Sequence, residues 1–155
     1  MTRSFPGLLA LLCFISGIAS AAPVVRAIDG DTLMVGGVTI DLYGIDAPEM
    51  DQHCTWGKKS IPCGVLARDA LLDLITGVSV ACDPPVRSAE GRNVATCTGD
   101  GFDIGQNMVH TGWSLADRKQ TAKYGAIEDK ARQARRGLWR GSFTPPWRWR
   151  AQHQK

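Results

Sequence analysis

The chain has 155 residues, of which 44% are hydrophobic and 21% charged, and its formal net charge is +3 at pH 7. This length is enough for one domain with one modest core and leaves no room within these residues for a second domain of similar size. The small net charge hides a gradient, because acids dominate from Asp29 to Asp51 while basic residues are concentrated from Arg118 to Lys155. A basic flank beside an acidic pocket suits a polyanionic ligand, although a solvated basic tail would have the same composition.

The N-terminus has the pattern of an export signal. Arg3 supplies the positive start, an apolar run extends from Leu8 to Ile18, and small residues at 19–21 provide a cleavage site. The apolar run is too short to serve as a membrane anchor. We therefore expect residues 1–21 to be removed, leaving a domain at 22–150 and a short tail at 151–155 in the periplasm or outside the cell, without membrane attachment.

Short β-branched and apolar runs at 24–28, 32–35 and 38–45 predict three strands. The turns between them are Asp29-Gly30-Asp31 and Gly36-Gly37, so the strands form a meander. Pro48 ends the third strand, because proline has no N–H to donate to a sheet. The segment 50–62 is polar and contains a cysteine, with another directly after it, and we expect it to be a loop held by its own crosslink.

Apolar residues at helical spacing predict a helix over 64–76, which Gly77 closes. Two further strands, at 78–82 and 94–98, are joined by a loop at 83–93. Asp103 caps a helix that runs to about residue 110, and a longer helix covers 122–136. The stretch 145–150 is expected to fold back over the body through its indoles. This order of elements predicts an α+β domain with three helices, built on a small closed five-stranded barrel of the oligonucleotide/oligosaccharide-binding (OB) kind.

Four cysteines remain after the export signal, an even number that indicates disulfides in an exported protein. Four cysteines allow three pairings. We favour Cys54 with Cys63 across a short loop, and Cys82 with Cys97 between neighbouring strands. Zinc binding is the weaker alternative, because no Cys-x-x-Cys spacing occurs and the histidines are scattered.

Carboxylates are concentrated beside the tight turns at 29–31 and 41–49. Clustered acids in a small core are costly, because each is desolvated against the negative charge of the others. A divalent cation would compensate this charge, and calcium accepts several oxygen ligands in loose geometry. Taken alone, Asp31 has a second interpretation as a turn aspartate that satisfies its own backbone.

A set of short motifs resembles the staphylococcal nuclease (thermonuclease) family over nearly the whole chain after residue 21. The motifs are Asp29-Gly30-Asp31-Thr32, Gly44-Ile45-Asp46-Ala47-Pro48-Glu49, Glu90-Gly91-Arg92 with Val94-Ala95, Gly101-x-Asp103, Gly112-Trp113, Arg136-Gly137-Leu138-Trp139 and a Pro-Trp-x-Trp-Arg end. Each is weak alone, and the resemblance rests on their order and spacing. It implies an exported, calcium-dependent nuclease that hydrolyses DNA and RNA.

The resemblance also implies roles for individual residues. Asp31, Asp46 and the backbone carbonyl of Ala47 would bind calcium. Glu49 would position or deprotonate the attacking water, and Arg92 would grip the phosphate and stabilise the departing oxygen. These residue types suit the reaction, because hydrolysis places extra negative charge on the phosphoryl oxygens, which a hard cation and guanidinium groups stabilise.

Three substrate-facing positions depart from the family pattern. Asp41 stands where the family has a second catalytic arginine, and Asp117 and Gln120 stand near positions where exported relatives have tyrosines. An acid at position 41 would repel the phosphate, and losing one such electrostatic contact costs on the order of 10²-fold in rate.

These departures leave two alternatives to a nuclease. One is a non-catalytic module that binds nucleic acid or another polyanion on the same fold. The other is an envelope protein that contacts another protein through its tryptophans. No apolar stripe marks an oligomer interface, so we expect a monomer.

Overall fold

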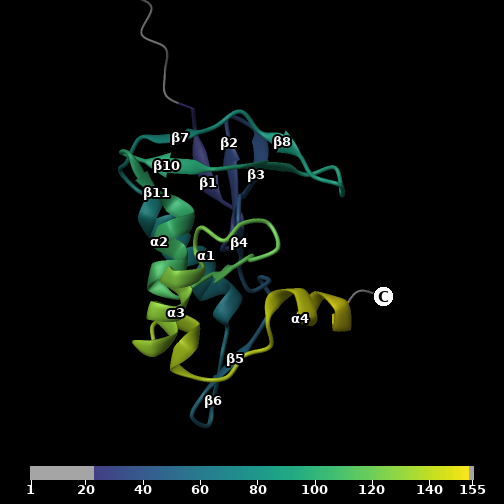
Figure 1. Ribbon diagram of the computed structural model, residues 1–155, viewed down its shortest axis with the longest axis vertical. Coiled ribbons are helices and arrows are strands. Elements are labelled where there is room, and N and C mark those ends of the chain that lie inside the picture. The colour runs from purple at the N-terminus through teal and green to yellow at the C-terminus, as the bar shows by residue number, and fades with distance from the viewer. Residues whose placement is uncertain (1–22, 154–155) are drawn as a thin grey trace, which may run out of the picture.

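The computed structural model describes residues 23–153, which form a mixed α+β fold (Figure 1). In chain order the strands are β1 (Val25–Ala27), β2 (Thr32–Val35), β3 (Val38–Leu42), β4 (Ile45–Asp46), β5 (Cys54–Trp56), β6 (Lys59–Ile61), β7 (Val80–Cys82), β8 (Val86–Arg87), β9 (Asn93–Ala95), β10 (Cys97–Gly99), β11 (Phe102–Asp103) and β12 (Leu115–Ala116). The helices are α1 (Cys63–Ile75), α2 (Ile104–Thr111), α3 (Gly125–Gln133) and α4 (Pro146–His153), with a 3-10 helix η1 at Gly137–Arg140. The export signal expected at 1–21 lies outside the described residues. No helix within 23–153 has both the length and the apolar character needed to cross a membrane.

Two chain segments, residues 80–87 and 93–99, each contribute one strand to both of two sheets. The larger sheet has the strand order β1-β2-β3-β9-β8, with β3 and β9 parallel, and the smaller has the order β11-β10-β7. One residue separates β9 from β10, and a short link separates β7 from β8, so each segment passes from one sheet to the other. Strands β1 and β8 are the two ends of the larger sheet. The pairing of the described strands therefore does not close into the expected barrel, and the helix count also differs, with four α-helices in place of three.

Glycines explain where the predicted meander is kept and where it breaks. Gly36 and Gly37 have φ values of 57° and 85° and form the turn between β2 and β3 as expected. The run 38–45, predicted as one strand, is divided into β3 and β4 because Gly44 adopts a left-handed φ of 78°. This break places Asp41 and Asp46 on opposite sides of a tight corner.

Both favoured disulfides are confirmed. Cys54 pairs with Cys63, and Cys82 pairs with Cys97, which lies directly opposite it in the β7–β10 register. The first disulfide ties the start of α1 to a β5–β6 hairpin within the segment predicted to be a loop. None of these four sulfurs is therefore free to bind zinc.

The core lies between the larger sheet and the helices α1 and α2, which Figure 1 shows below the sheets. Its buried members include Leu33, Ile40, Leu42, Ile45, Leu71, Ile75, Ile104, Met108, Val109 and Tyr124. Gly64 in the first turn of α1 lets that turn approach the Glu49 backbone, because a Cβ at position 64 would lie 1.7 Å from the Glu49 carbonyl oxygen. This close contact fixes the loop that carries Glu49.

The C-terminal segment is fastened to the disulfide-linked hairpin. The backbones of Thr55 and Ser142 exchange two hydrogen bonds of 2.9 Å, and Leu138 belongs to the same buried cluster as Cys54 and Cys63. Helix α4 follows and lies to one side, apart from α1, α2 and α3 (Figure 1).

The end of the chain does return to the body, as predicted, but with different side chains. Pro146 is buried, whereas Trp147 remains 46% exposed and Trp149 stacks on His153 within α4. Helix α4 also continues to His153, past the domain end expected at residue 150. Arg150 of this helix forms hydrogen bonds with Asp46 and Glu49.

Candidate active site

The metal-binding and catalytic residues nominated from the sequence, except Ala47, line one pocket of about 460 Å³. Its wall contains seven carboxylates and two arginines, namely Asp29, Asp31, Asp41, Asp46, Glu49, Glu90, Asp117, Arg92 and Arg150. The pocket therefore combines a strongly acidic wall with two guanidinium groups. We refer to it as the acidic pocket.

Asp31 is held by hydrogen bonds from the backbone and from its neighbouring hydroxyl. Its Oδ2 accepts a 2.6 Å hydrogen bond from the Ala47 N–H, and its Oδ1 accepts one of 3.2 Å from the Thr32 hydroxyl. Burial raises the pKa of Asp31 well above its usual range, and the negative charges of Asp29 and Asp46 raise it further. The negative charge at this position is therefore poorly compensated by the protein itself.

Asp46 and Glu49 are joined by the guanidinium of Arg150. Nη1 and Nη2 of Arg150 donate to the two carboxylate oxygens of Asp46 at 2.8 and 2.9 Å, and Nη1 also donates to Oε1 of Glu49 at 2.7 Å. Burial raises the pKa of Asp46, and the bonded guanidinium opposes that rise. The hydrogen bond to Asp46 in turn raises the pKa of Arg150 above its ordinary value, so Arg150 stays charged.

Asp41, the acid at the position of the missing arginine, forms an ion pair with Arg92. The parallel pairing of β3 and β9 places Asp41 opposite Val94, close to Arg92, which directly precedes β9. Burial raises the pKa of Asp41, and the charge of Arg92 opposes this. The acid therefore compensates Arg92 in the absence of a phosphate.

Asp117 and Gln120 brace the corner between β3 and β4 as well as lining the acidic pocket. Gln120 Nε2 donates to Asp117 Oδ2 at 2.8 Å, and Gln120 Oε1 accepts from the Gly44 N–H at 3.2 Å. The Tyr43 hydroxyl donates to the Gln120 carbonyl at 2.7 Å. Asp117 and Gln120 thus stabilise this corner, a role that the resemblance to nucleases did not indicate.

The donor atoms of the acidic pocket are of the type that calcium accepts. Within residues 23–153, no three acidic, histidine or cysteine side chains lie close enough together to hold an ion alone. Asp31 and Asp46 line the same pocket, and the negative charge of Asp46 raises the pKa of Asp31. Calcium accepts an all-oxygen donor set, which two carboxylates, a carbonyl such as that of Ala47, and water would form. The ion would supply positive charge to compensate the carboxylate of Asp31.

Arg150 is the site residue that sequence reasoning missed. It belongs to the Pro-Trp-x-Trp-Arg end, a motif noted for its indoles. Its partners Asp46 and Glu49 lie more than a hundred residues earlier in the chain, so no local spacing indicates the contact.

Two larger pockets adjoin the acidic pocket on different sides. One of about 660 Å³ shares Glu90, Arg92 and Asp117 with it, among others. The other, of about 770 Å³, shares Asp46, Asp117 and Arg150. Asp117 lines all three pockets, so they adjoin one another, and we refer to them together as the connected groove.

Comparisons with known proteins agree on one family. Residues 39–141 match the family model described as staphylococcal nuclease homologue. The chain is 34% identical over 140 residues to an uncharacterized endonuclease of Escherichia coli O157:H7, covering 85% of this chain and 84% of that protein. It is 30% identical over 148 residues to the succinoglycan biosynthesis protein ExoI of Rhizobium meliloti (strain 1021), covering 90% and 76%. It is also 30% identical over 124 residues to the probable staphylococcal-like nuclease CAN1 of Oryza sativa subsp. japonica, covering 78% and 35%. The chain belongs to the family of staphylococcal nuclease homologues.

Proposed function

We propose that the protein is an exported nuclease that hydrolyses phosphodiester bonds of DNA or RNA with calcium as its metal ion. The observation that carries this proposal is the acidic pocket, in which the carboxylates of Asp31 and Asp46 lie together with Arg92 and Arg150. Membership of the family supports it, as do relatives whose names describe them as an endonuclease and a staphylococcal-like nuclease.

Each residue of the acidic pocket has a role in this proposal. Asp31, Asp46 and the Ala47 carbonyl would hold calcium, which when bound supplies positive charge to the phosphoryl oxygens. Glu49 would accept the proton of the attacking water, because its second carboxylate oxygen is not bonded to Arg150. Arg92 would leave its ion pair with Asp41 to bind the phosphate. Because that ion pair must break first, Asp41 reduces the net stabilisation that Arg92 gives to the phosphate.

A polymer suits the connected groove better than a mononucleotide does. The two flanking pockets carry basic residues, among them Arg87 in one and Arg118, Lys119 and Arg132 in the other. Such residues bind phosphates regardless of base sequence, so we expect little sequence preference. We propose that the protein acts as a monomer, and that its two disulfides reflect an oxidising compartment such as the periplasm or the cell exterior.

The test is cleavage of plasmid DNA and of RNA by residues 22–155, with calcium and with a chelator in its place. Cleavage should stop with the chelator and fall by at least about 10²-fold in Asp46→Asn. Asp73→Asn, which changes an exposed acid on α1, is the matched control and should cleave like the parent. No cleavage at high protein concentration would reject the proposal.

A second candidate is a module that binds nucleic acid without cleaving it. Its support is that both arginines of the acidic pocket are paired with carboxylates, Arg92 with Asp41 and Arg150 with Asp46. Affinity that falls steeply with salt, without any cleavage in calcium, would favour this candidate over a nuclease.

A further inference from the structure

The guanidinium of Arg150 has one unused edge. Its three hydrogen bonds to Asp46 and Glu49 occupy both N–H groups of Nη1 and one of Nη2. A guanidinium has five N–H groups, so one on Nη2 and the one on Nε remain. Nothing among residues 23–153 accepts a hydrogen bond from these two, which lie side by side on the same edge of the planar group.

Such an edge matches two oxygens of a phosphate, which guanidinium groups bind through paired parallel hydrogen bonds. The Arg150 side chain is 36% exposed, so a ligand in the groove can reach it. We propose that Arg150 is a phosphate-binding catalytic residue, which α4 presents to the acidic pocket that Arg92 also lines. This inference rests on the proposed nuclease function.

The position of Arg150 along the groove agrees with this role. Arg150 lines both the acidic pocket and the adjoining pocket of about 770 Å³. Arg92 lines the acidic pocket and the pocket on its other side. A nucleic-acid strand that occupies all three pockets therefore meets both arginines.

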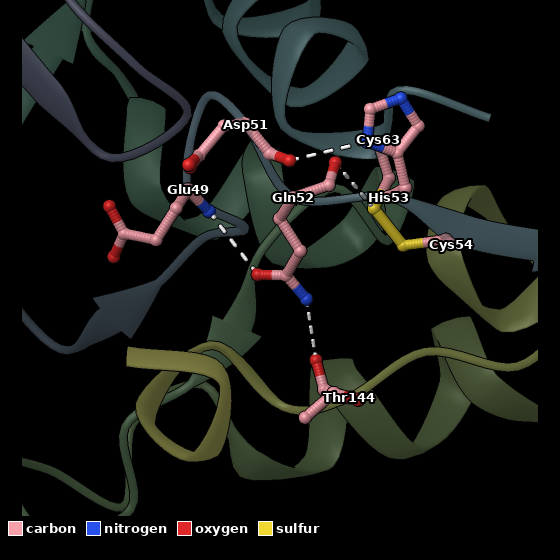
Figure 2. Close-up of a disulfide and its surroundings, with 7 residues drawn as sticks. All are labelled: Glu49, Asp51, Gln52, His53, Cys54, Cys63 and Thr144. Carbon is pink, nitrogen blue, oxygen red and sulfur yellow. Dashed lines mark hydrogen bonds between the residues drawn. A yellow bond between two sulfur atoms is a disulfide. The ribbon is translucent and has the colours of Figure 1, made fainter. Parts of the chain in front are cut away.

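Arg150 is also held in place before any ligand arrives. The buried side chain of Gln52 donates from Nε2 to the Thr144 carbonyl at 2.7 Å, directly before α4. Its Oε1 accepts from the Glu49 N–H at 3.3 Å, so one side chain joins the Glu49 loop to the base of α4 (Figure 2). Arg150 and Glu49 are thus positioned together, and preorganised charges stabilise a transition state without reorganisation.

The opposite hypothesis is that Arg150 acts as an internal cation that blocks the pocket. It would then occupy Asp46 in place of a divalent ion, and its removal would raise both activity and ion affinity. The two hypotheses predict changes of opposite sign, so one variant separates them.

The first experiment compares Arg150→Gln and Arg150→Lys with Arg148→Gln. Arg148 is an exposed residue of the same helix that forms no ion pair within residues 23–153, so it controls for the loss of one charge. We expect kcat/KM in calcium to fall at least about tenfold in Arg150→Gln. Lysine should restore only part of it, because it lacks the paired donors, and Arg148→Gln should stay within about twofold.

The second experiment uses fluorescence anisotropy of a short single-stranded DNA in excess chelator, where no hydrolysis occurs. Arg150→Gln should weaken binding several-fold and reduce the slope of log affinity against log salt by about 0.7, the loss of one phosphate contact. Circular dichroism spectra that match the parent show that each variant is folded.

The outcomes separate failure of this inference from failure of the proposed function. If the parent cleaves, and Arg150→Gln cleaves and binds DNA as well as Arg148→Gln does, Arg150 touches no phosphate and the inference is wrong. If Arg150→Gln cleaves faster than the parent, Arg150 is a blocking cation. If the parent itself does not cleave, the nuclease proposal fails, and the binding measurement still decides whether Arg150 contacts a phosphate.

Discussion

Replacing Gln52 by leucine tests how the C-terminal helix is held against the Glu49 loop. Gln52 is completely buried and makes two side-chain hydrogen bonds, one with the Glu49 N–H and one with the Thr144 carbonyl (Figure 2). Leucine has a similar size but makes neither bond. The substitution therefore leaves a donor and an acceptor without their partner while keeping most of the packing.

The cost follows from the two bonds. A protein hydrogen bond contributes about 0.5–1.5 kcal/mol net, and a buried group left unpaired costs about 1–3 kcal/mol. The shorter bond, of 2.7 Å to Thr144, is the stronger, and both sites are only partly buried. We expect the free energy of unfolding to fall by about 2–3 kcal/mol, which lowers Tm by roughly 10 °C in a domain of this size.

Urea unfolding measures the total loss, and limited trypsin digestion locates it. Cleavage after Arg148 and Arg150 should become faster in Gln52→Leu, because α4 is no longer tied to the Glu49 loop. Gln106→Leu, a change at an exposed position of α2, should shift stability by less than about 0.5 kcal/mol. If Gln52→Leu has the urea midpoint of the parent and the same digestion rate at α4, the bridge does not hold the helix and the reasoning is refuted.

Three further changes test other parts of the structure. The raised pKa of Asp31 makes its ionisation oppose folding, so the stability of the metal-free protein should fall as pH rises from the ordinary pKa through the folded one. Asp31→Asn should remove this fall and raise the free energy of unfolding by about 1 kcal/mol at pH 7, while nuclease activity is lost. Equal unfolding curves of variant and parent at pH 7 would count against this prediction. Burial would raise the pKa of Asp103, but hydrogen bonds from Lys123 and others hold it below its usual value. The contribution of Asp103 to the free energy of unfolding is thus complete above about pH 4 and is lost as the pH falls below that. In denaturant titrations, Asp103→Asn should lower the free energy of unfolding by about 1 kcal/mol at pH 7 and leave it unchanged near pH 2. An equal loss at both pH values would disprove this. Removing the Cys82–Cys97 disulfide by double serine substitution should lower the free energy of unfolding by about 3 kcal/mol in the same titration, given a sequence separation of 15. A loss below about 1 kcal/mol would mean that this crosslink does not restrict the conformations of the unfolded chain.

Local patterns were sufficient for much of the fold. Strand 32–35 and its glycine turn, and the helices after Pro62 and Asp103, follow from periodicity and capping. The even number of cysteines indicated disulfides, and the short loop and neighbouring strands favoured the two pairings that the structure contains. The break at Gly44 was not predictable in this way, because glycine is compatible with both a strand and a corner. The β5–β6 hairpin was also missed, since Met50 to Pro62 has no apolar alternation and its strands are short.

The site shows the same division between local and long-range information. Asp31, Asp46 and Glu49 could be nominated because turns and a family pattern surround them. Arg150 could not, because its placement depends on Gln52 and on backbone pairing of Thr55 with Ser142, about ninety residues apart. Pairing of this kind has no signature in either segment alone.

Calorimetric titration of calcium into the protein tests most directly whether Asp31 and Asp46 form an ion site. We expect one calcium ion to bind per chain of the parent, and Asp46→Asn to abolish the binding heat while Asp73→Asn retains it. No calcium uptake by the parent, or equal uptake by Asp46→Asn, would contradict the assignment of the acidic pocket as the metal centre of a nuclease.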